Sequence, residues 1–187
     1  MIIAQTKKKE NIIEYMLYMW QVEDLIRANN LDMQKIDQNI ITQYHDQPAD
    51  LLLEIRDWWE NLVEMMRLEK KEQSGHLQIN LNTVNDLHQL HMTLMKDVRE
   101  AAYRNQYYQT APFIIEFERK MGQTPGNEID TCLTAIYSSF LLKLQGKEIS
   151  SGTREAVRSI SRLMALLAKK YPLWQAGKIG DENDNEQ

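Results

Sequence analysis

Three ionisable side chains, Glu23, His91 and Lys143, fall on helix faces that are otherwise apolar. Successive residues of a helix are about 100° apart. On this spacing, Glu23 lies in the middle of the most apolar face of a helix predicted from Thr6 to Ala28. A carboxylate, an imidazole and an amine buried close together would have shifted pKa values and could exchange protons or hold a small polar ligand. The candidate internal polar site consists of these three residues and their neighbours Asp24, Arg27 and His88.

The same residues also have a structural interpretation, which the sequence favours. Glu23 can pair with Arg27 one turn later, and Lys143 is close enough to a helix end for its long side chain to reach water. A single buried histidine is usually just hydrogen-bonded. Because a buried charge is costly unless it is paired and hydrogen-bonded, the fold must supply partners under either interpretation.

The motifs of common catalytic and metal sites are missing from the sequence. His88 and His91 are three residues apart on one predicted helix, but neither Glu-x-x-His nor His-Glu-x-x-His occurs. The single cysteine, Cys132, rules out a zinc ribbon. There is also no Gly-x-Ser-x-Gly, Walker loop or Gly-x-Gly-x-x-Gly. We therefore expect no metal and no cofactor, and the sequence disfavours a conventional enzyme.

A basic stripe is the second candidate feature. Arg154, Arg158 and Arg162 recur every four residues on the last predicted helix, with Lys169 near the same line. Such a stripe can contact an acidic partner, a phosphate or RNA. However, 27 acidic against 22 basic residues give a net charge of −5, which disfavours general nucleic-acid binding. A solvated helix face is the favoured interpretation.

The elements that must position these residues are almost all helices. The apolar spacing predicts one helix over residues 6–28 and others that begin near Asp32, Asp46–Pro48, Asn82, Thr110–Pro112, Asn127 and Ser150–Ser151. Residues 76–80 alternate briefly and are predicted to be extended, and residues 101–110 are predicted to be a frayed helix or loop. The expected fold is a single all-α bundle of about six or seven helices over residues 1–176, followed by a disordered acidic tail over residues 177–187.

The composition of the chain and its first helix indicate where the protein is located and what it contacts. Hydrophobic residues make up 43% of the chain, which is typical of a globular protein. The longest uncharged runs, such as residues 131–142, are too short to cross a bilayer, and a lone cysteine fits a reduced, cytoplasmic setting. The first helix is apolar around most of its circumference, so it lies either in the centre of the bundle or in a homodimer interface.

Three stretches resemble an uncharacterised family of bacterial helical proteins of similar length, classed as a domain of unknown function. They are the opening MIIAQTKKKENIIEYMLYMWQVEDLIRANN, the stretch GHLQIN at residues 75–80 and the stretch LQGKEIS at residues 144–150. The resemblance covers essentially the whole ordered chain. It implies a compact intracellular bacterial protein and assigns no catalytic residue.

We expect from the sequence a non-enzymatic helical bundle that acts through protein–protein contacts, as a homodimer or an adaptor. The alternative is a small-molecule-binding or catalytic bundle built on the internal polar site. A nucleic-acid binder that uses Arg154, Arg158 and Arg162 is the third and weakest interpretation.

Overall fold

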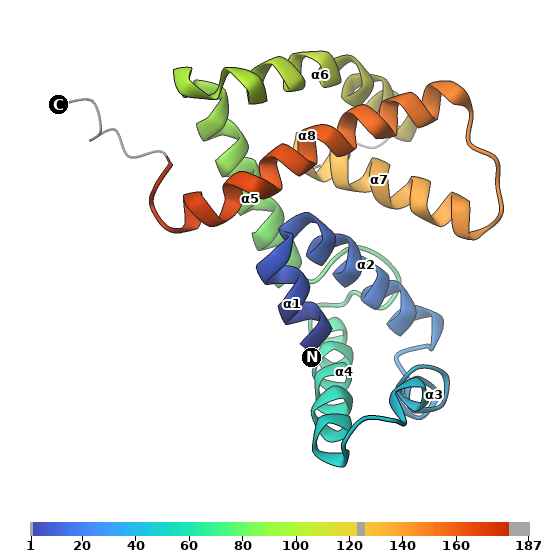
Figure 1. Cartoon of the computed structure of the whole chain (residues 1–187). Helices are drawn as coiled ribbons and strands as arrows, with labels where there is room; N and C mark the ends of the chain where they lie inside the picture. Colours follow the sequence, from blue (N-terminus) through green and yellow to red (C-terminus); the bar gives the residue numbers. More distant parts are fainter. Residues whose placement is uncertain (1, 123–125, 180–187) are drawn as a thin grey trace. The chain divides into compact units, whose positions relative to one another are not determined.

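The computed structural model describes residues 2–122 and 126–179, and their regular secondary structure is all helical, as the sequence predicts (Figure 1). The described residues form eight α-helices and two short 3-10 helices, without a strand. The α-helices are α1 (Ile2–Glu10), α2 (Ile12–Ala28), α3 (Met33–Asn39), α4 (Ala49–Leu68), α5 (Gln78–Lys96), α6 (Ala101–Met121), α7 (Glu128–Leu144) and α8 (Ser151–Gln175). The 3-10 helices are η1 (Ile41–Tyr44) and η2 (Val98–Glu100).

The chain divides into two compact units, each of which is described by itself. The first consists of residues 1–10 and 14–82, and the second of residues 11–13 and 83–187. A single domain over residues 1–176 stays a prediction. Of the predicted acidic tail, all but residues 177–179 lies outside the described residues.

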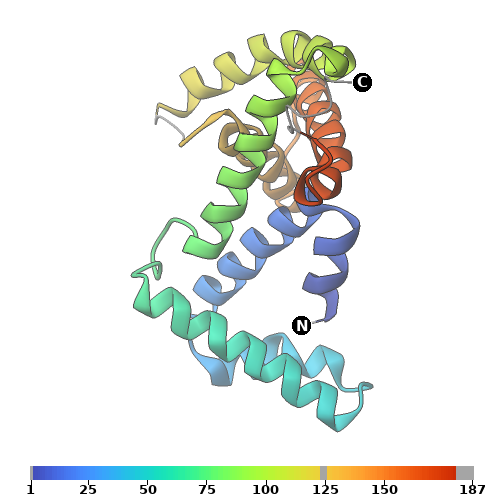
Figure 2. The ribbon, with the colours of Figure 1, turned by 90° about the vertical axis from the view of Figure 1, so that its left-hand side faces the viewer.

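The core of the first unit lies between α2, α3 and α4. Helix α3 packs on α4, and Figure 2 shows these two helices running side by side. The core side chains come from α1 to α4, η1 and the adjoining loops, and the most deeply buried are Met19, Val22, Ile26, Ile36, Trp59, Val63, Met66 and Leu77. Helix α2 therefore lies in the core of the first unit. This is one of the two positions that its apolar surface predicted, the other being a homodimer interface.

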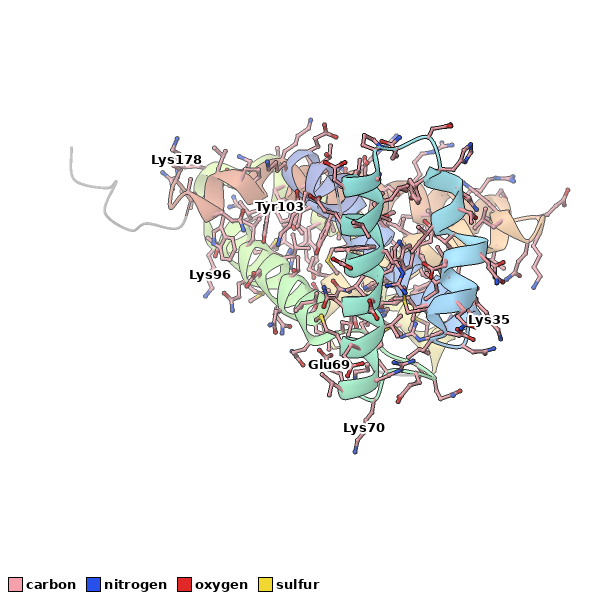
Figure 3. The ribbon with its side chains drawn as sticks, turned by 90° about the horizontal axis from the view of Figure 1, so that it is seen from below. Lys35, Glu69, Lys70, Lys96, Tyr103 and Lys178 are labelled. Atoms are coloured by element: carbon pink, nitrogen blue, oxygen red, sulfur yellow. The ribbon has the colours of Figure 1, made fainter. Side chains whose placement is uncertain are left out.

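Helices α2 and α4 end in the same way, in left-handed turns made without glycine. After α2, Leu31 N donates to Ile26 O at 3.0 Å, and after α4, Lys71 N donates to Met66 O at 2.8 Å. Asn30, Leu31 and Lys70 have φ angles of 56°. A side chain in this region is usually disfavoured. Figure 3 shows that the Lys70 side chain points away from the end of α4.

The second unit is built on three helices that pack against one another, α6, α7 and α8 (Figure 1). Its most deeply buried side chains come from these helices and from α5, and they include Leu87, Leu90, Leu94, Tyr103, Ile129, Leu133, Leu163 and Leu167. Two of its helices begin at predicted starts, and a side chain caps each of them: Asn127 Oδ1 accepts from Ile129 N and Asp130 N, both at 3.0 Å, and Ser150 Oγ accepts from Thr153 N at 3.2 Å.

The prediction of one helix over residues 6–28 was wrong. The helix is interrupted at Asn11, whose side-chain oxygen accepts from Ile13 N at 3.0 Å and starts α2 as a new helix.

The predicted extended stretch over residues 76–80 was also wrong. Helix α5 already begins at Gln78 because carboxylates from elsewhere in the first unit accept the N–H groups at its start. Glu23 Oε1 accepts from Leu77 N at 2.9 Å, and Glu69 Oε2 accepts from Gln78 N at 2.7 Å.

Residues 101–110, predicted to be a frayed helix or loop, are the first half of the regular helix α6, which continues through Pro112. Tyr103 and Tyr107 lie four residues apart on its inner face, where burial stabilises the helix. Pro112 is exposed, so the carbonyl one turn before it, which loses its helical partner, can bond to water.

Candidate functional site

Glu23 is the centre of a buried polar cluster in the first unit. Its side chain is fully buried, and its two carboxylate oxygens accept three hydrogen bonds from residues that follow α4. His76 Nδ1 donates at 2.6 Å, Asn80 Nδ2 at 2.7 Å and Leu77 N at 2.9 Å. The carboxylate also lies at the N-terminus of α5, where the positive end of the helix dipole favours a negative charge.

His76 is held from two sides. The carboxylate of Glu23 binds its Nδ1, and its ring stacks on Trp20 with 4.1 Å between ring centroids and 14° between ring planes. The His76 side chain is 28% exposed, so the imidazole lies at the edge of the cluster. A carboxylate that binds Nδ1 fixes the ring and its tautomer and makes Nε2 the remaining position for proton exchange.

The sequence analysis missed His76 and Asn80. Both are more than 50 residues from Glu23, and His76 lies in a loop, where helical spacing says nothing about its direction. The brief GHLQIN stretch carried no signal that its side chains meet a residue of α2.

Arg27 bonds to the loop after α4 rather than to Glu23. Its Nη1 binds Asp24 Oδ1 at 2.8 Å, and its Nε donates to Lys71 O at 3.2 Å. Its Nη2 donates to Gly75 O. The predicted pairing of Glu23 with Arg27 was therefore wrong: Arg27 binds Asp24 and the loop carbonyl groups, and Glu23 binds residues 76, 77 and 80.

Arg67 makes the reciprocal contact. Its Nη2 donates to Leu31 O, just after the end of α2, at 2.8 Å. Arg27 of α2 thus bonds to carbonyl groups after α4, and Arg67 of α4 bonds to a carbonyl group after α2. A polar pocket of about 630 Å³ lies beside these contacts, lined by Arg27, Asn30, Leu31, Arg67, Glu72 and Gln73. Of the predicted site residues, Arg27 lines this pocket.

His91 is the centre of a separate cluster in the second unit. It is almost completely buried; its Nδ1 lies 2.8 Å from Tyr103 Oη and its Nε2 lies 3.4 Å from Glu128 Oε2. Tyr107 Oη donates to Glu128 Oε1 at 2.9 Å. Burial lowers the pKa of His91, and the carboxylate of Glu128 partly opposes this shift.

The two phenols and the thiol of this cluster have raised pKa values. Burial raises the pKa of Tyr103, and burial together with Glu128 raises the pKa of Tyr107 to about 12. Burial also raises the pKa of the Cys132 thiol. The ring of His88 lies 6.0 Å from that of His91, and its buried Nδ1 has no hydrogen-bond partner among the described residues. Tyr103, His91 and Tyr107 are thus connected through hydrogen bonds and the half-exposed carboxylate of Glu128.

The prediction that Lys143 faces a buried surface was wrong. Lys143 is exposed in the last turn of α7, where a lysine is favoured by the helix dipole and by water. Glu23 and His91 are both buried, but they belong to different units. Across the described residues, no group of three or more His, Cys, Asp or Glu side chains is arranged to hold a metal ion.

Comparisons with known proteins identify the family of the chain. Within the residues that the structure describes, no helix has the length and apolar character needed to cross a membrane. No curated protein and no solved structure matches the chain significantly. One family model does match, over residues 1–178, and its description is "Domain of unknown function (DUF4924)". The chain, with its buried Glu23 and His91 clusters, belongs to this family of unknown function.

Proposed function

We propose that this protein acts through protein–protein contacts, and that its first partner is a second copy of the same chain. The observation that carries the proposal is an exposed apolar strip on α6, formed by Tyr108, Pro112 and Ile115, which we call the α6 ridge. The Tyr108 and Ile115 side chains are 64% and 65% exposed. Large apolar side chains exposed in a row commonly mark an interaction surface.

The spacing of the α6 ridge favours a helix as its partner. Ala101, Tyr108 and Ile115 are seven residues apart, and Pro112 lies between the last two on the same face. A seven-residue repeat keeps one strip of a helix against a neighbouring helix. Two copies of α6 in antiparallel orientation would place Tyr108 of each copy against Ile115 of the other, the self-complementary arrangement of a two-fold dimer.

The polar clusters support a non-enzymatic role. Every carboxylate oxygen of Glu23 and both ring nitrogens of His91 are engaged within the fold. Groups that act as acids or bases on a substrate need access to it. Glu23 and His91 instead serve to fasten one segment of their unit to another.

The pocket beside Arg27 and Arg67 favours a second candidate function, the binding of a small polar molecule. Its volume of about 630 Å³ lies in the usual range for ligand pockets. A metabolite panel in a thermal-shift assay tests this candidate. A hit should be lost in Gln73→Trp, which fills the pocket from an exposed lining position and leaves both arginines in place. Retention of the shift in that variant would place the ligand elsewhere.

Sedimentation equilibrium tests the proposed dimer. Ile115→Asp places two charges in the paired ridge, and we expect it to raise the dimer dissociation constant at least about tenfold, which corresponds to roughly 1.4 kcal/mol. Leu53→Asp on α4 is the matched control, because Leu53 is 63% exposed and lies outside the ridge. A dimer weakened equally by both changes would contradict the assignment of the ridge.

The cellular setting is part of the proposal. A bacterial origin is what the resemblance of the sequence implies, and a cytoplasmic setting agrees with the single, buried cysteine, which makes no disulfide within the chain.

A further inference from the structure

The arginines of the chain differ in whether the fold holds them beside a cavity. Arg154, Arg158 and Arg162 of the predicted basic stripe are exposed on α8. Arg27 and Arg67, by contrast, line the pocket of about 630 Å³ in the first unit. Each of its six lining residues belongs to the last turn of α2 or α4 or to the segment that follows that turn. The pocket therefore lies where the ends of these two helices meet.

The two arginines of the pocket have donors left for a ligand. The Arg27 side chain is 16% exposed and is fixed by Asp24 and by two carbonyl groups after α4, which take three of its five N–H groups. Arg67 makes one hydrogen bond within the described part of the chain, to Leu31 O, and lies 3.7 Å from Glu64. A carboxylate can accept two hydrogen bonds from a single guanidinium group, so this pair of arginines suits a carboxylate.

Glu72 supplies the opposite charge to the same pocket. It is half-buried, and the ion pairs within 4.0 Å that the described residues form do not include it. Its side chain also makes no hydrogen bond with another described residue. A charge that is partly withdrawn from water gains more from a nearby opposite charge than an exposed one does. Glu72 is therefore suited to a cationic group of a ligand.

Part of the pocket wall is backbone in a disfavoured conformation. Asn30 and Leu31 line the pocket, and both have φ angles of 56°. Asparagine is enriched in this left-handed region, whereas a leucine there is uncommon. Residues held in such conformations cluster at ligand sites, where the surrounding structure fixes them. Here Leu31 N donates to Ile26 O, and Leu31 O accepts from Arg67, so the wall is fixed on both sides.

We propose that this pocket binds a small zwitterion, a molecule with both a carboxylate and an ammonium group, as in a free amino acid or a short peptide. The carboxylate lies against Arg27 and Arg67, and the ammonium group lies against Glu72. A simple anion would be repelled by Glu72 and would leave it without a partner. The inference rests on the second candidate function, for which it names the ligand class, and it is independent of the proposed dimer.

Isothermal titration calorimetry on the full chain tests the proposal. The probes are the standard amino acids in one arm and a set of di- and tripeptides in the other, so that the two sources of a zwitterion are distinguished. We expect a probe to bind and its binding to be lost in Gln73→Trp, which fills the pocket. The N-acetylated and the C-terminally amidated forms of that probe each lack one charge, and each should bind at least about tenfold more weakly.

A variant of Glu72 tests the contact with the ammonium group. In Glu72→Gln the zwitterion should bind at least about tenfold more weakly, whereas its N-acetylated form should lose no affinity. Glu54→Gln is the matched control and should change neither affinity, because Glu54 is an exposed carboxylate of α4 that does not line the pocket.

Three results would overturn the proposal: no amino acid or peptide binds, binding persists in Gln73→Trp, or Glu72→Gln leaves the affinity of the zwitterion unchanged. A metabolite of another class that binds in the thermal-shift panel and is lost in Gln73→Trp would overturn the ligand class alone and would keep the pocket as a binding site. If nothing binds in either assay, the second candidate function fails as well.

Discussion

Removal of the Glu23 carboxylate should destabilise the first unit strongly. In Glu23→Ala the N–H groups of Leu77 and Asn80 stay buried without an acceptor, and each such donor costs about 1–3 kcal/mol. His76 is partly exposed and can turn to water at smaller cost. Because the mutation also removes the cost of burying a charge, we expect a net loss of about 3 kcal/mol in the free energy of unfolding.

The variant Glu23→Gln distinguishes the contribution of the side chain's shape from that of its charge. Glutamine keeps the volume and one acceptor oxygen, but its amide NH2 group must face one of the three donors, so we expect about half the loss of the alanine variant. Glu64→Ala is the control on α4. Its side chain is 60% exposed and lies 3.7 Å from Arg67, and exposed pairs of this kind contribute less than about 1 kcal/mol.

Urea unfolding followed by circular dichroism measures these free energies, and amide hydrogen exchange at Leu77 locates the effect. We expect the Leu77 amide to lose most of its protection in Glu23→Ala, since its acceptor is gone. If Glu23→Ala costs no more than Glu64→Ala and the Leu77 amide stays protected, the carboxylate does not hold the start of α5 and the reasoning is refuted.

Three further predictions follow from His91, Lys70 and Cys132. Burial lowers the pKa of His91, so the stability that neutral His91 contributes is complete above the unfolded pKa of about 6.5 and is lost as the pH falls below that value. In His91→Gln the urea concentration at the unfolding midpoint should therefore depend less on pH between about pH 8 and pH 5. An unchanged pH profile would contradict this prediction. Lys70→Gly should add about 0.5–1 kcal/mol of stability in urea unfolding, because glycine accepts the φ angle of 56°, whereas Lys35→Gly inside α3 should lower it. The Cys132 thiol, buried and with a raised pKa, should react with iodoacetamide only after unfolding, and modification of the folded protein at a comparable rate, checked by mass spectrometry, would be inconsistent with its position.

Local signals in the sequence predicted most of the fold. The helix starts near Asp32, Asn127 and Ser150 were predicted correctly, since each depends on a side chain that bonds to the backbone two or three residues later. The boundaries that failed depend on distant residues. The start of α5 is set by Glu23, more than 50 residues earlier, and no local pattern reports such a contact.

The candidate site was predicted in part. The burial of Glu23 and His91 followed from their position on apolar helix faces, because helical spacing shows which face a residue shares. Their partners did not follow, because spacing within a helix does not show which other segment packs on that face. For Lys143 the pattern was misleading, because in a last turn the side chain can leave an apolar face for water.

The mass of the unmodified protein in solution tests the central claim, that the chain acts through contacts with a second copy of itself. Light scattering over a hundredfold range of protein concentration gives this mass directly. The account predicts about twice the 22.1 kDa of one chain at the upper concentrations, with a decline toward 22.1 kDa on dilution or in Ile115→Asp. A mass of 22.1 kDa at every concentration would contradict it.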